Sequence, residues 1–361
     1  QRSRAICSVN LIWIYPVLYF SSSLLALIDQ DPVIAQHACS YNRASLCGIF
    51  AWAQYIVLAV FLRNRQHATL AAACTCLGAL LHPIWALTFV HGLDLGNAGV
   101  GYANSVTWWL QYILLAGYAY IKSEKFGLSA WTIIGIEASA FEGWYSYLDV
   151  AVPAFLQSCS EMWFWEVISP LVGLIGANEL AAQVSIVNFI MLVFMPLASL
   201  GMAGATVVGM AIGEGSRTKA ANFVVAVLAT TVGLGGCVAL LLGFGASVIA
   251  ALYTPDTDVQ SLATPVIRLF GLATLWKSLF VSIGAIFRGT GRTKFSSAVT
   301  AAAYWAISFP LFLFFGFVLN WGFFWMWVGI CVGSLAVLPI YAHALYYMDF
   351  QVLIDERMQA N

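Results

Sequence analysis

Long apolar stretches alternate with short polar connections along the whole chain. Ten stretches reach the length of about 20 mostly apolar residues that an α-helix needs to cross a bilayer. They cover residues 9–28, 46–62, 69–90, 98–121, 148–175, 181–212, 220–252, 263–287, 296–319 and 321–347. Several exceed one bilayer thickness, so we expect these helices to be tilted or to extend into the interface. The pattern predicts an all-α polytopic membrane protein with ten spans.

Composition supports a membrane protein and excludes a soluble domain. The 361 residues are 61% hydrophobic and only 9% charged, whereas soluble domains carry about 25% charged residues. The net charge of −1 offers no basic field for nucleic acid. Membrane lipid is therefore an expected partner, and nucleic acid is not.

The eight cysteines are scattered, mostly within apolar runs. Cys74 and Cys76 form the only close pair, and nearby histidines do not complete a metal-site pattern. We interpret all eight as small buried hydrophobic residues and expect no metal site.

Charge divides the connections into two alternating sets. The basic set consists of Arg2, Arg4, Arg63, Arg65, His67, Lys122, Lys125, Arg217, Lys219, Arg288, Arg292 and Lys294. The alternate connections carry Asp29, Asp31, Asp94, Glu179, Asp256 and Asp258, with almost no Lys or Arg apart from Arg43. The positive-inside rule places the basic connections in the cytoplasm. Both ends of this chain are then cytoplasmic, as an even number of spans requires.

The longest polar connection divides the chain into two bundles. We expect an N-terminal bundle of four spans over 1–121, an interfacial linker over 122–147, a bundle of six spans over 148–347 and a cytoplasmic tail over 348–361. The sequence begins at Gln1, without an initial Met and without a signal-peptide pattern. We therefore expect the chain to be a piece of a longer protein. Two helices before Gln1 would make the bundles equal.

The two bundles repeat charged positions at one offset of 225 residues. The matching pairs are Asp31 and Asp256, Arg43 and Arg268, and Arg63 and Arg288. Pro83 and Pro310 follow at 227, and each half has a glycine turn, at Gly96 and Gly322. The offset indicates a duplication, which is the usual plan of secondary transporters, whose substrate site lies between the halves.

Five motifs in order resemble the multidrug and toxic compound extrusion (MATE) family, and its eukaryotic branch in particular. They are Gln1–Ser3, Gln30–Pro32 followed by Tyr41–Arg43, Ala151–Glu166 with an Ala-Val-Pro entry and two Glu around an aromatic cluster, Arg288–Lys294, and Ala303–Trp305 with Phe309–Pro310. The resemblance covers essentially the whole chain, as the family's helices three to twelve.

The resemblance implies two six-helix bundles around a central cavity, of which this chain holds ten spans. It implies a secondary active antiporter, not an enzyme, that exchanges H⁺ or Na⁺ for organic cations, toxins or plant-type metabolites by alternating access. No cofactor is expected besides the coupling ion, and the expected state is a monomer in the plasma membrane or in a vacuolar or vesicular membrane.

Three polar residues within the spans fall at one depth. Glu161 lies 12 residues past Asp149, Lys277 lies 11 before Arg288, and Tyr304 lies 10 past Lys294. At 1.5 Å per residue these are about 18, 16 and 15 Å from the cytoplasmic end, close to the midplane. Charged groups in spans are costly, so each is a functional candidate.

We assign ion coupling to Glu161 and Glu166, which lie about 140° apart around a helix and cannot form a shared dyad. Aromatic and amide side chains that can bind a planar organic cation are Trp163, Tyr304, Trp305, Trp108 and Gln111. A structural reading stays open for all of them: the carboxylates as hydrogen-bonded buried groups, and the aromatics as packing residues.

Lys277 departs from the family pattern, which has an acidic residue 11 positions before the Arg of the R-G-x-G loop. We expect Lys277 to form an ion pair with Glu161, which would offset the desolvation of both. Residues 205–211, in the sixth span of this chain, also lack three polar groups that the family motif has at the corresponding positions. Both changes leave an organic anion or a zwitterion open as the substrate.

Two other functions remain as alternatives. One is a flippase for a lipid-linked oligosaccharide, which would favour a strongly cationic cavity. The other is a membrane receptor or scaffold without transport, against which the duplication and the intramembrane charges argue.

Overall fold

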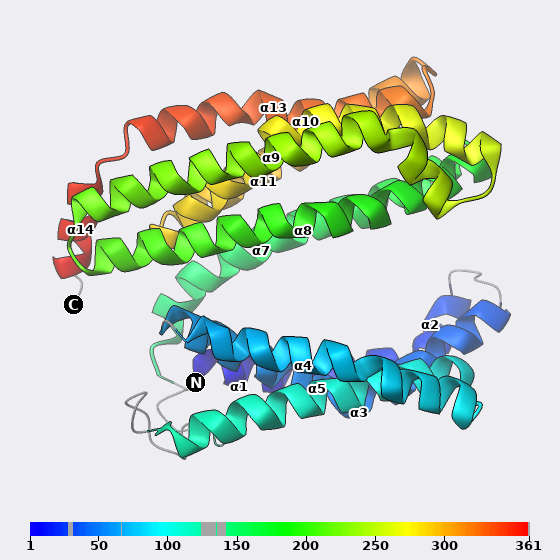
Figure 1. Ribbon diagram of the computed structural model, residues 1–361, viewed down its shortest axis with the longest axis horizontal. Coiled ribbons are helices and arrows are strands. Elements are labelled where there is room, and N and C mark those ends of the chain that lie inside the picture. The colour runs from blue at the N-terminus through cyan, green and yellow to red at the C-terminus, as the bar shows by residue number, and fades with distance from the viewer. Residues whose placement is uncertain (28–31, 66, 124–134, 136–141, 360–361) are drawn as a thin grey trace. The chain divides into compact units, whose positions relative to one another are not determined.

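The computed structural model describes residues 1–27, 32–65, 67–123, 135 and 142–359. All regular elements in these ranges are helices, which confirms the predicted all-α fold (Figure 1). The chain forms two compact units, Gln1–Tyr147 and Leu148–Asn361. The second unit begins at the first residue predicted for the second bundle. Most of the predicted linker, and Asp29 and Asp31, lie outside the described residues.

The first unit is built around two long helices that pack against each other. Its elements are α1 (Arg2–Tyr19), α2 (Ser21–Ala26), α3 (Pro32–Asn64), α4 (Ala68–Leu87), the π-helical segment η1 (Thr88–Gly92) and α5 (Gly96–Ile121). Helix α3 packs on α1, α2 and α5, and α4 packs on α5. An apolar cluster that includes Tyr55, Leu62 and Leu115 fills the space between α3, α4 and α5.

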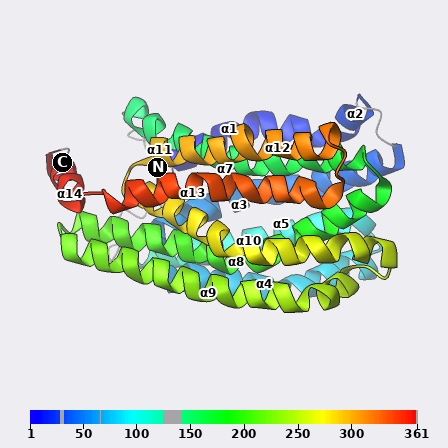
Figure 2. The same cartoon turned by 90° about the horizontal axis from the view of Figure 1, so that it is seen from above.

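The second unit holds a larger core. Its elements are α7 (Trp144–Gly173), α8 (Ala177–Gly213), α9 (Arg217–Tyr253), α10 (Thr257–Gly289), α11 (Thr293–Ala301), η4 (Ala302–Ser308), α12 (Phe309–Leu313), η5 (Phe314–Val318), α13 (Phe323–Tyr346) and α14 (Phe350–Gln359). Helix α10 packs against α8, α9 and α13, so its side chains are buried on several faces. Figure 2 shows α8 and α9 running side by side along this unit.

Each of the ten predicted spans coincides with a long helical stretch, although several helices extend beyond the predicted ends. The largest difference is α3, which begins at Pro32, whereas the prediction began at residue 46. Among the described residues, seven helical stretches are long and apolar enough to cross a membrane. They are α3, α4 with η1, α8, α9, α10, the run from α11 to η5, and α13. Helices α1, α5 and α7 are not among these seven and contain more polar residues. Helix α7, for example, carries the three acidic residues Asp149, Glu161 and Glu166.

Helix boundaries support the internal repeat. Helices α3 and α10 each have 33 residues, and both of their ends differ by 225 positions (257 − 32 and 289 − 64). The next helices, α4 and α11, begin at Ala68 and Thr293, again 225 apart. The charged positions had indicated the same offset. The two halves therefore share helix lengths as well as charges.

The turns after these helices match too, at an offset of 226. Both runs end in a five-residue π-helical segment, η1 and η5. Asp94 and Asn320 then have positive φ angles of 51° and 50°, and Gly96 and Gly322 have 52° and 87°. Left-handed backbone at two positions of one turn is uncommon outside Gly, Asn and Asp. The predicted glycine turns are confirmed.

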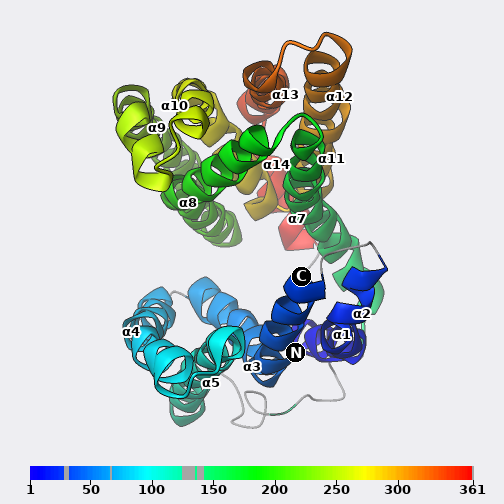
Figure 3. The same cartoon turned by 90° about the vertical axis from the view of Figure 1, so that its right-hand side faces the viewer.

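The predicted tail contains a helix that packs on the bundle. Phe350, Leu353 and Ile354 of α14 are buried in an apolar cluster with residues of α8, α9 and α10, and Arg292 forms an exposed salt bridge of 3.1 Å with Glu356. Helix α14 thus connects the ends of three long helices (Figure 3).

The interpretation of the cysteines was wrong in part. Cys39, Cys74 and Cys331 are buried, but Cys47, Cys76 and Cys237 are exposed on their helices. An apolar face on a membrane helix can meet lipid, so an apolar stretch does not determine which residues are buried within the protein.

Candidate functional site in the second unit

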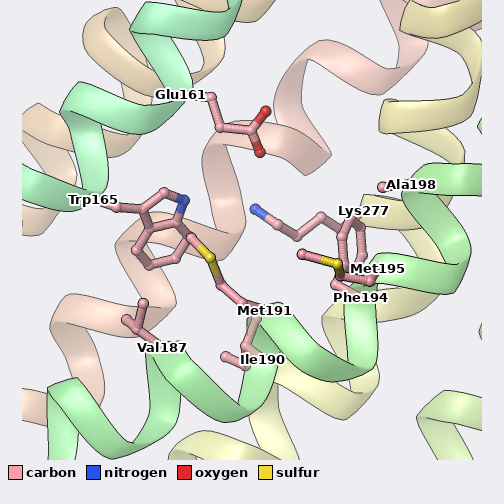
Figure 4. Close-up of a pocket in the computed structure, with 9 residues that line it drawn as sticks. All are labelled: Glu161, Trp165, Val187, Ile190, Met191, Phe194, Met195, Ala198 and Lys277. Atoms are coloured by element: carbon pink, nitrogen blue, oxygen red, sulfur yellow. The ribbon is translucent and has the colours of Figure 1, made fainter. Parts of the chain in front are cut away.

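A cavity of about 160 Å³ lies between α7, α8 and α10 of the second unit (Figure 4). Two of its lining residues are charged, Glu161 and Lys277. The others are apolar or aromatic: Trp165, Val187, Ile190, Met191, Phe194, Met195 and Ala198. A mostly apolar cavity with a few convergent polar groups is the usual form of a small-molecule site.

Glu161 is held by a residue of the π-helical segment η4. The Tyr304 hydroxyl donates a hydrogen bond of 2.9 Å to Glu161 Oε1, and Tyr304 is only 3% exposed. Next to it, Trp305 Nε1 donates to the Ser160 carbonyl oxygen at 3.1 Å. Two neighbouring residues of η4 therefore bind two neighbouring residues of α7. Such π-helical segments occur frequently at functional sites because they turn side chains out of the regular helical register.

Lys277 lies at the same depth, as the helix rise predicted. Its side chain is buried, and its ammonium nitrogen lies 5.3 Å from the ring centre of Tyr304, 5.6 Å from that of Trp165 and 6.0 Å from that of Phe270. These distances are within the range of cation–π attraction. Figure 4 shows the ammonium directed into the cavity, toward Glu161 and Trp165.

The predicted ion pair between Glu161 and Lys277 is wrong in this conformation. The salt bridges among the described residues are Lys219–Glu214, Arg292–Glu356 and Lys294–Asp149. Matching depth along two helices brought the charged groups to one cavity. It did not bring them into contact, because Tyr304 holds the carboxylate and aromatic rings surround the ammonium.

The other predicted residues of the second unit lie elsewhere. Glu166 is exposed and does not line the cavity, in keeping with its angle of about 140° from Glu161. Trp163 is 56% exposed and also lies outside the cavity. Trp305 packs against Phe164 and Phe309. Of the proposed substrate-binding aromatics in this unit, only Tyr304 reaches Glu161 and Lys277.

The candidates of the first unit are engaged in helix packing. Gln111 is buried, and its side chain lies directly against Gly78 of α4, where a Cβ atom would overlap it. The Trp108 ring packs against the Trp52 ring in a tilted arrangement, with ring centres 6.0 Å apart. Both residues thereby join α5 to a neighbouring helix within this unit.

Comparisons with known proteins support the family resemblance. The MatE family model matches residues 153–314, a range that includes Glu161, Lys277 and Tyr304. This chain carries a MatE domain. The resemblance predicted from the sequence motifs is confirmed.

Curated relatives extend this similarity along the length of the chain. It is 27% identical over 337 residues to multidrug and toxin extrusion protein 2 of Oryctolagus cuniculus, covering 93% of this chain and 54% of the relative. It is 26% identical over 333 residues to multidrug and toxin extrusion protein 1 of Homo sapiens, covering 92% and 58%. The chain thus spans about half the length of the curated relatives that it matches.

Solved structures of MATE transporters share the fold of this chain. The eukaryotic MATE transporter AtDTX14 superposes with a TM-score of 0.90 at 21% identity, over 98% of this chain and 79% of that one. An inward-facing and an outward-facing structure of a multidrug resistance MATE family transporter superpose with TM-scores of 0.71 and 0.79, at 18% and 19% identity. Each superposition includes 99% of this chain, together with 80% of the inward-facing and 78% of the outward-facing structure.

One aromatic residue of this cavity was not among the residues predicted from the sequence. Trp165, not Trp163, lines the cavity with Glu161. Residues four apart lie on the same face of a helix, whereas residues two apart do not. The spacing from Glu161 to Trp165 was therefore a usable signal.

A second missed feature is a hydrogen-bonded histidine in the first unit. The Thr107 hydroxyl donates to the Ala103 carbonyl oxygen at 3.0 Å and accepts from Trp85 Nε1 at 3.0 Å. His82 Nδ1 lies 2.8 Å from the same hydroxyl oxygen. The Thr107 hydroxyl thus joins His82 and Trp85 of α4 to α5. Polar residues on three different turns of α4 and α5 gave no pattern by which to find this group.

Proposed function

We propose that this chain acts as a MATE-type secondary antiporter that exports small organic compounds in exchange for a coupling ion, by alternating access between its two bundles. The observation that carries the proposal is the pair of separated charges, Glu161 and Lys277, at one apolar cavity of the helical bundle. Two of the helices that line it, α8 and α10, are long and apolar enough to cross a membrane. Ionisable residues within spans are rare and mark transport pathways. Proteins of this fold adopting inward-facing and outward-facing conformations support alternating access.

We propose H⁺ rather than Na⁺ as the coupling ion, with Glu161 as its binding group. Small hard cations prefer several oxygen ligands. The cavity lining offers the Glu161 carboxylate, with the Tyr304 hydroxyl beside it, and also the positive charge of Lys277. The lining therefore has fewer oxygen ligands than Na⁺ prefers. A proton needs only one carboxylate oxygen, and Glu161 Oε2 has no hydrogen bond among those of the described residues.

The flippase alternative is less well supported by this cavity. A lipid-linked oligosaccharide carries phosphate groups, so its pathway favours several cationic residues. Here one lysine faces one glutamate, and the remaining lining is apolar.

The test is exchange in proteoliposomes. A pH gradient imposed at constant Na⁺ should drive counterflow of labelled organic compounds, and a Na⁺ gradient at constant pH should not. Glu161→Gln should abolish the gradient-driven exchange. Glu214→Gln is the matched control, because Glu214 is an exposed carboxylate that pairs with Lys219 at a helix end. Unchanged exchange in Glu161→Gln would show that another group binds the coupling ion.

A further inference from the structure

The Lys277 ammonium forms no salt bridge among the described residues. It carries three donor protons, and the hydrogen bonds and salt bridges of the described residues include none from this nitrogen. The side chain is 4% exposed. Aromatic faces attract a cation but do not replace the hydrogen bonds of a carboxylate or of water. A buried ammonium in this setting is costly unless an anion enters the cavity.

Glu161 is only partly satisfied. Tyr304 donates to Oε1, while an ionised carboxylate offers about four acceptor positions. Glu161 and Lys277 both face the cavity (Figure 4), yet they do not form an ion pair. The space between the two opposite charges therefore has unused acceptors on one side and unused donors on the other.

A ligand with a single charge fits this arrangement poorly. An organic cation at Glu161 would bring a second positive charge close to Lys277. An organic anion at Lys277 would bring a second negative charge close to Glu161. Like charges at short range in an apolar site repel strongly. A ligand that carries both charges pairs with both residues at once.

We infer that this cavity binds a small zwitterion, with its ammonium group at Glu161 and its carboxylate at Lys277. The inference rests on the proposed function and names its substrate class. A cavity of 160 Å³ suits a compact molecule such as an α-amino acid with an apolar side chain. Met191, Met195 and Phe194 of α8 line the apolar part, and methionine adapts readily to different apolar shapes.

This binding mode also explains how exchange is coupled. A proton that binds Glu161 neutralises the group that holds the ligand's ammonium, so proton and zwitterion compete for one carboxylate. The Lys277 charge does not change in this step and continues to favour a carboxylate. Competition at one site is the simplest basis for antiport, since each bundle movement carries one or the other.

The test is a binding measurement on the purified chain in detergent, without any gradient. The three probes share one body: L-leucine carries both charges, L-leucinamide only the ammonium, and N-acetyl-L-leucine only the carboxylate. We expect leucine to bind tighter than either blocked compound by on the order of 30-fold, because each lost charge contact in a desolvated site is large. Equal affinity of either blocked compound, or no binding of leucine, would overturn the inference.

Two variants assign the contacts. Lys277→Met should lose the preference for leucine over leucinamide, and Glu161→Gln should lose the preference for leucine over N-acetyl-leucine. Lys219→Met and Glu214→Gln remove the exposed pair of the same unit and should keep both preferences. If a cavity variant fails to fold, the comparison of the three probes on the unchanged chain still decides.

The outcome separates the inference from the proposed function. Leucine binding without exchange under a pH gradient would contradict the antiport and leave the site assignment in place. Gradient-driven exchange of other organic compounds, together with absent leucine binding, would contradict the zwitterion and leave the antiport in place.

Discussion

Tyr304 is the side chain that contacts both Glu161 and Lys277. Its hydroxyl holds one carboxylate oxygen, and its ring lies over the ammonium. Tyr304 therefore influences the position of the carboxylate as well as the surroundings of the ammonium. The Tyr304 hydroxyl and the Lys277 ammonium can be tested separately by substitution.

Tyr304→Phe should remove the hydrogen bond and keep the ring. Hydrogen bonds to charged groups contribute about 1.5–3 kcal/mol, so we expect a loss of stability in this range in detergent melting experiments. The released carboxylate should also bind a proton differently, which would shift the pH dependence of exchange. Trp305→Phe is a suitable control, because it removes a hydrogen bond to a neighbouring backbone carbonyl without touching Glu161. Equal effects of both variants on the pH dependence would contradict a special role for Tyr304.

Lys277→Met should leave the ligand-free protein as stable as before, or stabilise it. Replacing a buried charge by an apolar side chain of similar volume is often neutral or stabilising by about 1–4 kcal/mol, whereas breaking a buried ion pair costs about 3–5 kcal/mol. The melting temperature without ligand distinguishes these cases. A large decrease would mean that Lys277 pairs with an anion in the resting protein, as the sequence had predicted.

At the scale of helices, small residues determine how closely α8 and α10 approach. A Cβ atom on Gly289 would overlap the backbone of Ala205, and one on Gly209 would lie 2.9 Å from the Gly289 carbonyl oxygen. These contacts lie next to the turn after α10, where Gly291 has a φ of 86°. The short side chains in 205–211 that depart from the family motif therefore lie where the two helices touch.

Gly289→Ala should separate α8 from α10 and destabilise the second unit. Overpacking of this kind typically costs about 1–3 kcal/mol. Gly233→Ala in α9 is the matched control, because nothing lies within 4 Å of its added Cβ. The control should be neutral or stabilising by about 0.5–1 kcal/mol, since alanine favours a helix over glycine. Similar melting temperatures for both variants would show that α8 and α10 can move apart at little cost.

At the scale of the whole molecule, the duplication and the charge pattern lead to one orientation. The matched helices α3 and α10 each end with a basic residue, Arg63 and Arg288, and the charges of the connections alternate. The positive-inside rule then places these ends in the cytoplasm.

Single-cysteine labelling tests this orientation. With the eight native cysteines replaced, cysteines at Asp94 and Asp256 should react with an impermeant reagent added outside intact cells, and cysteines at Arg65 and Arg292 should react only after permeabilisation. Three native cysteines are exposed on their helices, so a cysteine-free background is required. The opposite pattern would reverse the orientation and the direction of export.

Hydropathy and charge spacing along the chain were enough to predict the helices, their repeat and the common level of Glu161, Lys277 and Tyr304. Hydrophobic length specifies a span, and a rise of 1.5 Å per residue places Glu161, Lys277 and Tyr304 at one level. Only the tertiary structure decided which side chains meet. The rotation of each helix about its axis is set by packing, and the π-helical turn of η4 shifts its register. For that reason Glu161 contacts Tyr304, Trp165 rather than Trp163 lines the cavity, and Glu166 points away from it.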